Sequence, residues 1–146
     1  MLKKSVSSAI FLCFLYQIGT GMFTASYPTN LTPSSGTNFI FGVVVVNDGS
    51  WYNNTTGEFT APLSGNYLFT GALCPQRSTS FYFGITLNGV EQTRAEYFES
   101  DGHVCHSYTS VLQLNANDKF AIKSVHPYNE LFEDHSRWNI FSGVKR

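Results

Sequence analysis

The sequence predicts an all-β domain, built as a sandwich of ten short strands. Segments rich in valine, isoleucine, phenylalanine, tyrosine and threonine alternate with clusters of glycine, asparagine, serine and proline. These turn clusters recur about every ten residues, a spacing typical of β-sandwiches. After residue 21, little of the chain has the spacing of an amphipathic helix.

The first strands are short and are separated by clear turn signals. A Pro-Ser-Ser-Gly cluster at 33–36 separates the first two, and the apolar run 43–46 is typical of a strand covered on both faces. The clusters at 47–49 and 53–57 contain glycine and asparagine, which tolerate the positive φ angles of tight turns. The strands expected in this half are 23–27, 39–46, 51–52 and 58–59.

The second half continues the same pattern. The segment 65–73 places aromatic residues at alternate positions, the period of a strand with two different faces. The dipeptide Asn-Gly at 88–89 predicts a two-residue hairpin, and further turn signals lie at 101–102 and 115–118. The strands expected here are 65–73, 80–87, 91–97, 104–114, 119–126 and 138–144.

Residues 1–21 have the layout of a secretory signal peptide. Lys3 and Lys4 precede an apolar run at 9–16, and small residues, Gly19 and Gly21, precede the expected cut. A membrane helix is the alternative, but this run is much shorter than the roughly 20 residues that a span needs. We therefore expect a secreted, extracellular chain of residues 22–146 without a transmembrane segment. A cut after residue 25 is the other option, although it would remove part of the first expected strand.

The charge of the mature chain excludes some partners. The signal peptide contains two of the nine basic residues and none of the ten acidic ones, so its removal changes the net charge from −1 to −3. No basic patch for nucleic acid is present. Charged residues make up 13% of the chain and aromatic residues 16%, which favours an oligomer, because interface cores are rich in aromatics and poor in charges.

The mature chain contains two cysteines, Cys74 and Cys105, since Cys13 lies in the expected signal peptide. An even number in an oxidising compartment favours a disulfide. Such a bridge would stabilise the domain by roughly 3–4 kcal/mol in the chain-entropy view. Two buried thiols are the alternative.

A ladder of aromatic, glycine and asparagine residues runs through the first half of the domain. Its members are Phe41, Asn47, Tyr52, Phe59, Gly65, Tyr67 and Phe69. Their spacing resembles the signature of the globular head domain of complement C1q. Later matches to that family are Asp118, Phe141 and Gly143. The resemblance spans residues 22–146, with two departures: Gly71 stands where the family prefers phenylalanine or tyrosine, and the chain ends in Val-Lys-Arg.

The resemblance implies a ten-stranded jelly roll, related to the tumour necrosis factor cytokines, that assembles as a homotrimer or heterotrimer. It implies a non-enzymatic recognition module in innate immunity or other extracellular ligand binding. Expected ligands are extracellular proteins, glycans or microbial surfaces. The alternative is a cytokine-like ligand of a cell-surface receptor. We expect binding through the loops 76–80, 100–106 and 128–137, because binding residues concentrate in loops on rigid scaffolds.

Metal and catalytic sites are not expected. The run from His103 to His106 has no second Cys/His pair to complete a zinc site. Calcium has candidate ligands in dispersed acidic residues, but a solvated acidic loop is favoured because no calcium-loop spacing is present. These residues are Asp48, Asp101, Asp118, Glu130, Glu133 and Asp134. Neither a Gly-x-Ser-x-Gly elbow nor a His-Glu-x-x-His motif occurs, so we expect no enzyme and no required cofactor.

Three asparagines occupy the acceptor position of Asn-x-Thr motifs, which marks glycosylation candidates in a secreted protein. They are Asn30, Asn53 and Asn54. Ordinary turn asparagines are the alternative.

Overall fold

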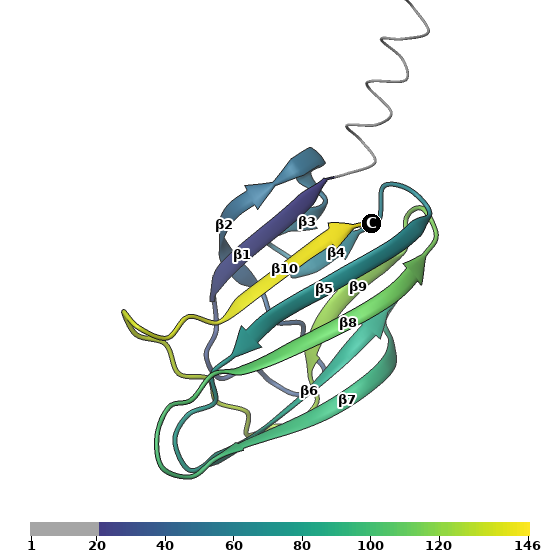
Figure 1. Ribbon diagram of the computed structural model, residues 1–146. Helices are drawn as coiled ribbons and strands as arrows, with labels where there is room; N and C mark the ends of the chain where they lie inside the picture. The colour runs from purple at the N-terminus through teal and green to yellow at the C-terminus, as the bar shows by residue number, and fades with distance from the viewer. Residues whose placement is uncertain (1–20) are drawn as a thin grey trace, which may run out of the picture.

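The computed structural model describes residues 21–146, so nearly all of the predicted signal peptide lies outside the described part. The described chain is a sandwich of two five-stranded antiparallel sheets (Figure 1). The first sheet has the order β2-β1-β10-β5-β8, and the second has the order β3-β4-β9-β6-β7. The prediction of ten strands in a sandwich is confirmed. No helix within residues 21–146 has the length and apolar character needed to cross a bilayer.

The strand bounds differ from the expected ones at their ends. The first sheet contains β1 (Met22–Pro28), β2 (Phe41–Asn47), β5 (Gly65–Leu73), β8 (His106–Leu114) and β10 (Ile140–Lys145). The second contains β3 (Tyr52–Asn53), β4 (Glu58–Thr60), β6 (Thr79–Leu87), β7 (Val90–Glu99) and β9 (Lys119–Ser124), and a short 3-10 turn (Asp48–Ser50) follows β2. The eighth strand starts at residue 106 instead of 104, the ninth ends at 124 instead of 126, and the tenth starts at 140 instead of 138.

The ladder of aromatic residues forms the centre of the core. Phe41, Tyr52, Phe59, Tyr67 and Phe69 are each at most 3% exposed. The two sheets meet at aromatic contacts such as that between Phe69 and Phe120, whose ring centroids lie 3.8 Å apart. Stacked and edge-to-face rings contribute beyond their buried area. The core therefore depends on ring shape as well as on hydrophobic burial.

Two polar residues of the family signature, Asn47 of the ladder and Asp118, stabilise turns. The Asn47 amide accepts the Tyr52 N–H at 3.0 Å and donates to the Tyr52 carbonyl at 2.8 Å, which closes the turn after β2. The Asp118 carboxylate accepts the Asn115 N–H at 2.8 Å and the Asn88 side-chain amide at 2.9 Å. The Asn88 and Asn115 donors lower the pKa of Asp118. This contact connects the turn between β6 and β7 to the turn between β8 and β9.

Two glycines of the core have no room for a side chain. A Cβ at Gly143 would lie 2.5 Å from the Phe23 ring and 2.8 Å from the Phe69 ring. At Gly71 a Cβ would lie 2.0 Å from the Ile140 carbonyl oxygen and 2.5 Å from the Tyr108 hydroxyl. Tyr108 is the cross-strand partner of Gly71 and is 6% exposed. Its ring fills the space beside Gly71, where the C1q resemblance leads us to expect an aromatic side chain.

Buried tyrosines predict that the domain loses stability in alkali. Burial raises the pKa of Tyr52 to about 12, an effect partly offset by the Phe41 N–H bond to its hydroxyl, and burial raises the pKa of Tyr108 well above its usual value. Because the folded-state pKa values are raised, this stability is complete below about pH 10 and is lost as the pH rises toward 12. We expect the temperature of the thermal unfolding midpoint to decrease as the pH rises from about 10 to 12. Tyr52 and Tyr108 should titrate only as circular dichroism reports unfolding. Complete tyrosine titration near pH 10 in a folded protein would contradict this.

Candidate recognition and assembly surfaces

The outward face of the first sheet carries an apolar row. The register aligns Met22 with Val144, Val144 with Leu68, and Leu68 with Val111, so these four side chains cross four neighbouring strands. Met22 is 47% exposed and Val111 is 68% exposed. Large apolar side chains gathered on one exposed face are typical of a surface that binds a partner.

A second row of small polar side chains lies beside the apolar row. It consists of Thr24, Ser142, Thr70 and Thr109, aligned by the same register. The Thr24 and Ser142 hydroxyls are 2.9 Å apart, and the Thr70 hydroxyl donates to the Tyr108 carbonyl at 3.0 Å. Because these hydroxyls bond within the sheet, little hydrogen bonding is lost if a partner covers them. A shallow cavity of about 130 Å³ lies between the two rows.

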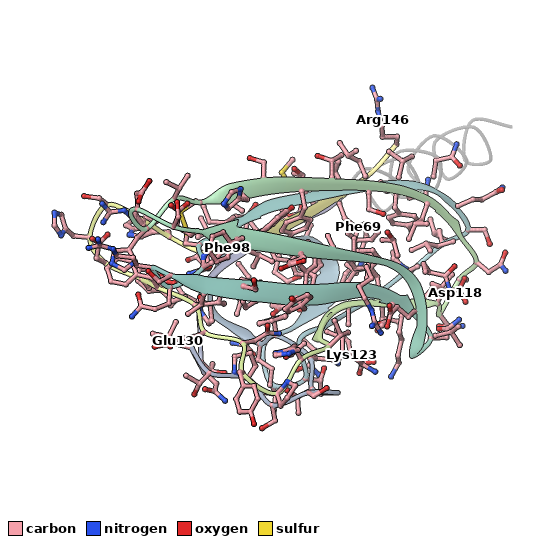
Figure 2. The ribbon with its side chains drawn as sticks, turned by 90° about the horizontal axis from the view of Figure 1, so that it is seen from below. Phe69, Phe98, Asp118, Lys123, Glu130 and Arg146 are labelled. Carbon is pink, nitrogen blue, oxygen red and sulfur yellow. A yellow bond between two sulfur atoms is a disulfide. The ribbon has the colours of Figure 1, made fainter. Side chains whose placement is uncertain are left out.

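The aligned rows on the outward face of the first sheet are uncharged, and the basic residue Arg146, whose N–H donates to the Asn66 carbonyl at 2.8 Å, lies at their margin (Figure 2). A third aligned row consists of Ser26, Ile140, Ala72 and Ser107, and Asn66 pairs with Gln113 beyond the apolar row. On the edge strand β2, Val43 is 50% exposed and Val45 is 71% exposed, so the expectation that both faces of 43–46 are covered is wrong for the single chain. Within residues 21–146, none of the outward positions in these rows holds an acidic or basic side chain. Charge depletion is the compositional mark of an interface core.

Three loops are tied together at the end of the sandwich opposite the turn that contains Asp118. Figure 2 shows Asp118 and Glu130 toward opposite ends. The disulfide between Cys74 and Cys105, with an S–S distance of 1.99 Å, joins the end of β5 to the loop between β7 and β8. The Phe132 N–H donates to the Cys74 carbonyl at 2.7 Å, and the Gln76 N–H donates to the Glu130 carbonyl at 3.0 Å. The connection from β9 to β10 is therefore bound to the loop after β5. We call these connected segments, 74–78, 100–105 and 125–139, the loop end.

Two buried asparagines fix the long connection between β9 and β10. Asn139 is fully buried, accepts the Cys74 N–H at 2.7 Å and donates to the Phe132 carbonyl at 2.9 Å. Asn129 is 2% exposed and pairs with the backbone of Tyr82, accepting its N–H at 2.8 Å and donating to its carbonyl. These amides replace backbone pairing, which is why β9 ends and β10 begins inside the ranges expected from sequence. Their role was not predicted, because nothing in a single sequence distinguishes a buried asparagine from a turn asparagine.

A stack of side chains covers the loop end. The His103 and Phe132 rings are parallel, with centroids 3.6 Å apart, and the Arg137 guanidinium lies 5.6 Å from the Phe132 centroid. The Arg77 N–H donates to His103 Nδ1 at 3.2 Å. Aromatic and arginine side chains dominate binding energy at protein interfaces, and here their positions are fixed before any partner binds.

Comparison with known proteins agrees with this geometry. The model of the C1q domain family matches residues 16–144. The chain belongs to the C1q domain family.

Solved structures agree on the fold. The globular domain of zebrafish complement 1qA superposes with a TM-score of 0.68 at 18% identity, covering 84% of this chain and 94% of that one. Murine APRIL at pH 5.0 superposes with a TM-score of 0.67 at 13% identity, covering 87% and 99%. Identities this low show the fold alone, which is the jelly roll shared by C1q and tumour necrosis factor-like domains. Domains of this class form trimers, are generally extracellular and generally bind ligands without catalysis.

The acidic candidates of this C1q domain are dispersed. Asp134 accepts the N–H groups of Ser136 and Arg137, each at 2.8 Å, and these donors lower its pKa, Ser136 most strongly. Glu133 accepts the Asn139 side-chain amide at 2.9 Å. Throughout residues 21–146, no three His, Cys, Asp or Glu side chains are grouped to hold a metal ion. Calcium dependence stays an untested expectation from sequence.

The histidines around the disulfide make separate contacts. Residues 103–105 precede β8, so His103 lies in the loop before that strand. His106 begins β8 and stacks on Tyr97 at 4.7 Å, with its Nε2 3.8 Å from Glu99. His103 therefore packs within the loop end, whereas His106 packs at the start of β8.

The three glycosylation candidates of the C1q domain all lie on the surface. Asn30 Oδ1 accepts the Thr32 N–H at 2.9 Å and lies 3.2 Å from the Thr32 hydroxyl. Asn53 Oδ1 accepts the Thr55 N–H at 2.8 Å, whereas the Asn54 amide donates to the Gly42 carbonyl at 3.3 Å. Each therefore also has an ordinary turn or capping role, and glycosylation at these sites stays a prediction.

Proposed function

We propose that this chain is a secreted, non-enzymatic recognition module that forms a homotrimer through the outward face of the first sheet. The loop end then presents three copies of one binding surface to extracellular ligands, in innate immunity or a related recognition process. Secretion rests on the predicted signal peptide at 1–21, and the Cys74–Cys105 disulfide supports an oxidising compartment. The trimer would increase the apparent affinity for repeated ligands through multivalency.

The main support for this proposal is the set of uncharged, aligned rows on the outward face of the first sheet. In a monomer this face would expose the apolar row of Met22, Val144, Leu68 and Val111 to water. Hydrophobic burial contributes roughly 25 cal/mol for each Å² of apolar surface removed from water, so covering the row favours association.

Light scattering on the protein purified from the medium of secreting cells tests the assembly. We expect a mass three times that of the mature monomer. A panel of glycans, lipids, bacterial surfaces and soluble receptors, with and without calcium, then tests recognition. A monomer at all concentrations would contradict the assembly, and retention of the protein inside the cells would contradict secretion. Binding only to one receptor would favour a cytokine-like ligand instead.

A further inference from the structure

Three rings contact one another where the second sheet meets the loop end. The Tyr82 and His126 ring centroids lie 4.7 Å apart, and those of His126 and Tyr128 lie 5.7 Å apart. Tyr82 comes from β6, whereas the other two belong to the connection after β9. Tyr128 is 80% exposed, so its ring contributes little to the core. We call these three residues the aromatic shelf.

The backbone holds the aromatic shelf in place. His126 Nδ1 accepts the Tyr128 N–H at 3.2 Å, which fixes the imidazole relative to the chain that carries Tyr128. The buried Asn129 side chain binds both backbone groups of Tyr82 and donates to the Ser124 hydroxyl at 2.8 Å. A ligand that binds these rings therefore does not need to order the loop first, which lowers the entropic cost of binding.

Polar groups surround the rings. Because His126 Nδ1 accepts a hydrogen bond, its Nε2 carries the proton of the neutral imidazole and is a donor. Glu96 is exposed and lies directly across from Tyr82 in the pairing of β6 with β7, so it supplies an acceptor. The hydroxyls of Tyr82 and Tyr128 act as donors and acceptors. Acceptors and donors at the rim of aromatic faces match a ligand with apolar C–H faces and a rim of hydroxyls.

We propose that the aromatic shelf binds a neutral saccharide, with the C–H face of a pyranose ring on the tyrosines and its hydroxyls bonded to His126 and Glu96. This rests on the proposed function and names the ligand class of its loop end. The Glu96 carboxylate disfavours an acidic sugar by charge repulsion. Of the two basic residues aligned with Gly84, one outward position along β6 from Tyr82, Arg94 is bound to Glu91 at 2.6 Å and Lys123 lies on β9. The selection against acidic sugars therefore rests on Glu96, which faces Tyr82 directly.

Binding of neutral and acidic glycans by the intact secreted protein tests this site. We expect an array of neutral oligosaccharides to retain the wild type and acidic ones to retain it less. Tyr128→Ala should weaken binding about tenfold or more, as expected when a central aromatic contact is removed, and Glu96→Gln should weaken it by a smaller factor. Val90→Ala is the control, because Val90 is an exposed apolar residue of the same sheet that lies beside the Asn88 turn, at the end opposite the loop end. Its glycan binding should equal that of the wild type.

The outcomes separate this proposal from the proposed function. A trimer that binds other members of the ligand panel but no neutral saccharide would overturn the aromatic shelf and leave the recognition module standing. Unchanged glycan binding in Tyr128→Ala, with a folded trimer by circular dichroism and light scattering, would also overturn the shelf. A preference for acidic glycans, or for a protein partner on this surface, would overturn the ligand class. A monomer that binds nothing in either panel would contradict both proposals.

Discussion

The Gly71→Ala variant is expected to lose on the order of 3 kcal/mol of folding free energy or more. The new methyl group would lie 2.0 Å from the Ile140 carbonyl oxygen, a backbone atom that cannot rotate away. Relief requires β5 and β10 to move apart, which disturbs the pairing of Gly71 with Phe141 and the packing of the Phe141 ring. Chemical denaturation followed by circular dichroism measures the loss.

Two further variants test which contact destabilises Gly71→Ala. Gly102→Ala is the matched control, since a Cβ there has no neighbouring atom within 4 Å, and we expect a change below about 0.5 kcal/mol. The double variant Gly71→Ala with Tyr108→Phe removes the hydroxyl contact at 2.5 Å but not the carbonyl contact. We expect it to remain as unstable as the single variant. Wild-type stability of Gly71→Ala would refute the close approach of β5 to β10.

The Leu68→Glu variant is expected to convert the trimer into a folded monomer. Leu68 lies inside the apolar row, between Val144 and Val111. In the assembly, three carboxylates would lose water, and no side chain of the apolar row or of the two rows beside it is basic. Uncompensated charges at an interface cost several kcal/mol, which is a large share of the association energy. Size-exclusion chromatography with light scattering should report one third of the wild-type mass.

The matched control for this variant changes an apolar side chain elsewhere. Val90 on β7 is 64% exposed and belongs to the second sheet, so Val90→Glu introduces the same charge away from the proposed interface. It should remain a trimer. Circular dichroism must show that Leu68→Glu is folded, since the side chain points away from the core. A trimeric Leu68→Glu protein would place the interface on another surface.

Much of the fold was predictable from sequence because the spacing of apolar and turn residues along the chain agrees with the strand arrangement of the sandwich. The spacing of Phe41, Tyr52, Phe59 and Phe69 reflects a core in which rings from both sheets meet, and the structure confirms the sandwich. The absence of an aromatic at residue 71 was also visible in the sequence. Its replacement by Tyr108 was not, because that depends on the register of β5 with β8.

The candidate surfaces were less predictable from sequence, because they depend on strand register and on contacts between distant residues. The uncharged face becomes visible only when the register aligns residues from five strands, although each strand alone shows alternation. The loops at 76–80, 100–106 and 128–137 were expected to bind ligands because they connect strands of a rigid scaffold. The role of Asn129 and Asn139 depends on long-range contacts with Tyr82 and Cys74, which no local pattern encodes.

The anchoring of the long connection by Asn129 and Asn139 has a practical consequence for engineering. Its tip, at His135 and Ser136, is exposed and is closed locally by hydrogen bonds between Asp134 and residues 136 and 137, so its sequence is not needed to hold the two ends in place. A foreign peptide inserted there would be held at both ends by the same buried amides. In the proposed trimer, the domain would then serve as a scaffold that displays three copies of the insert.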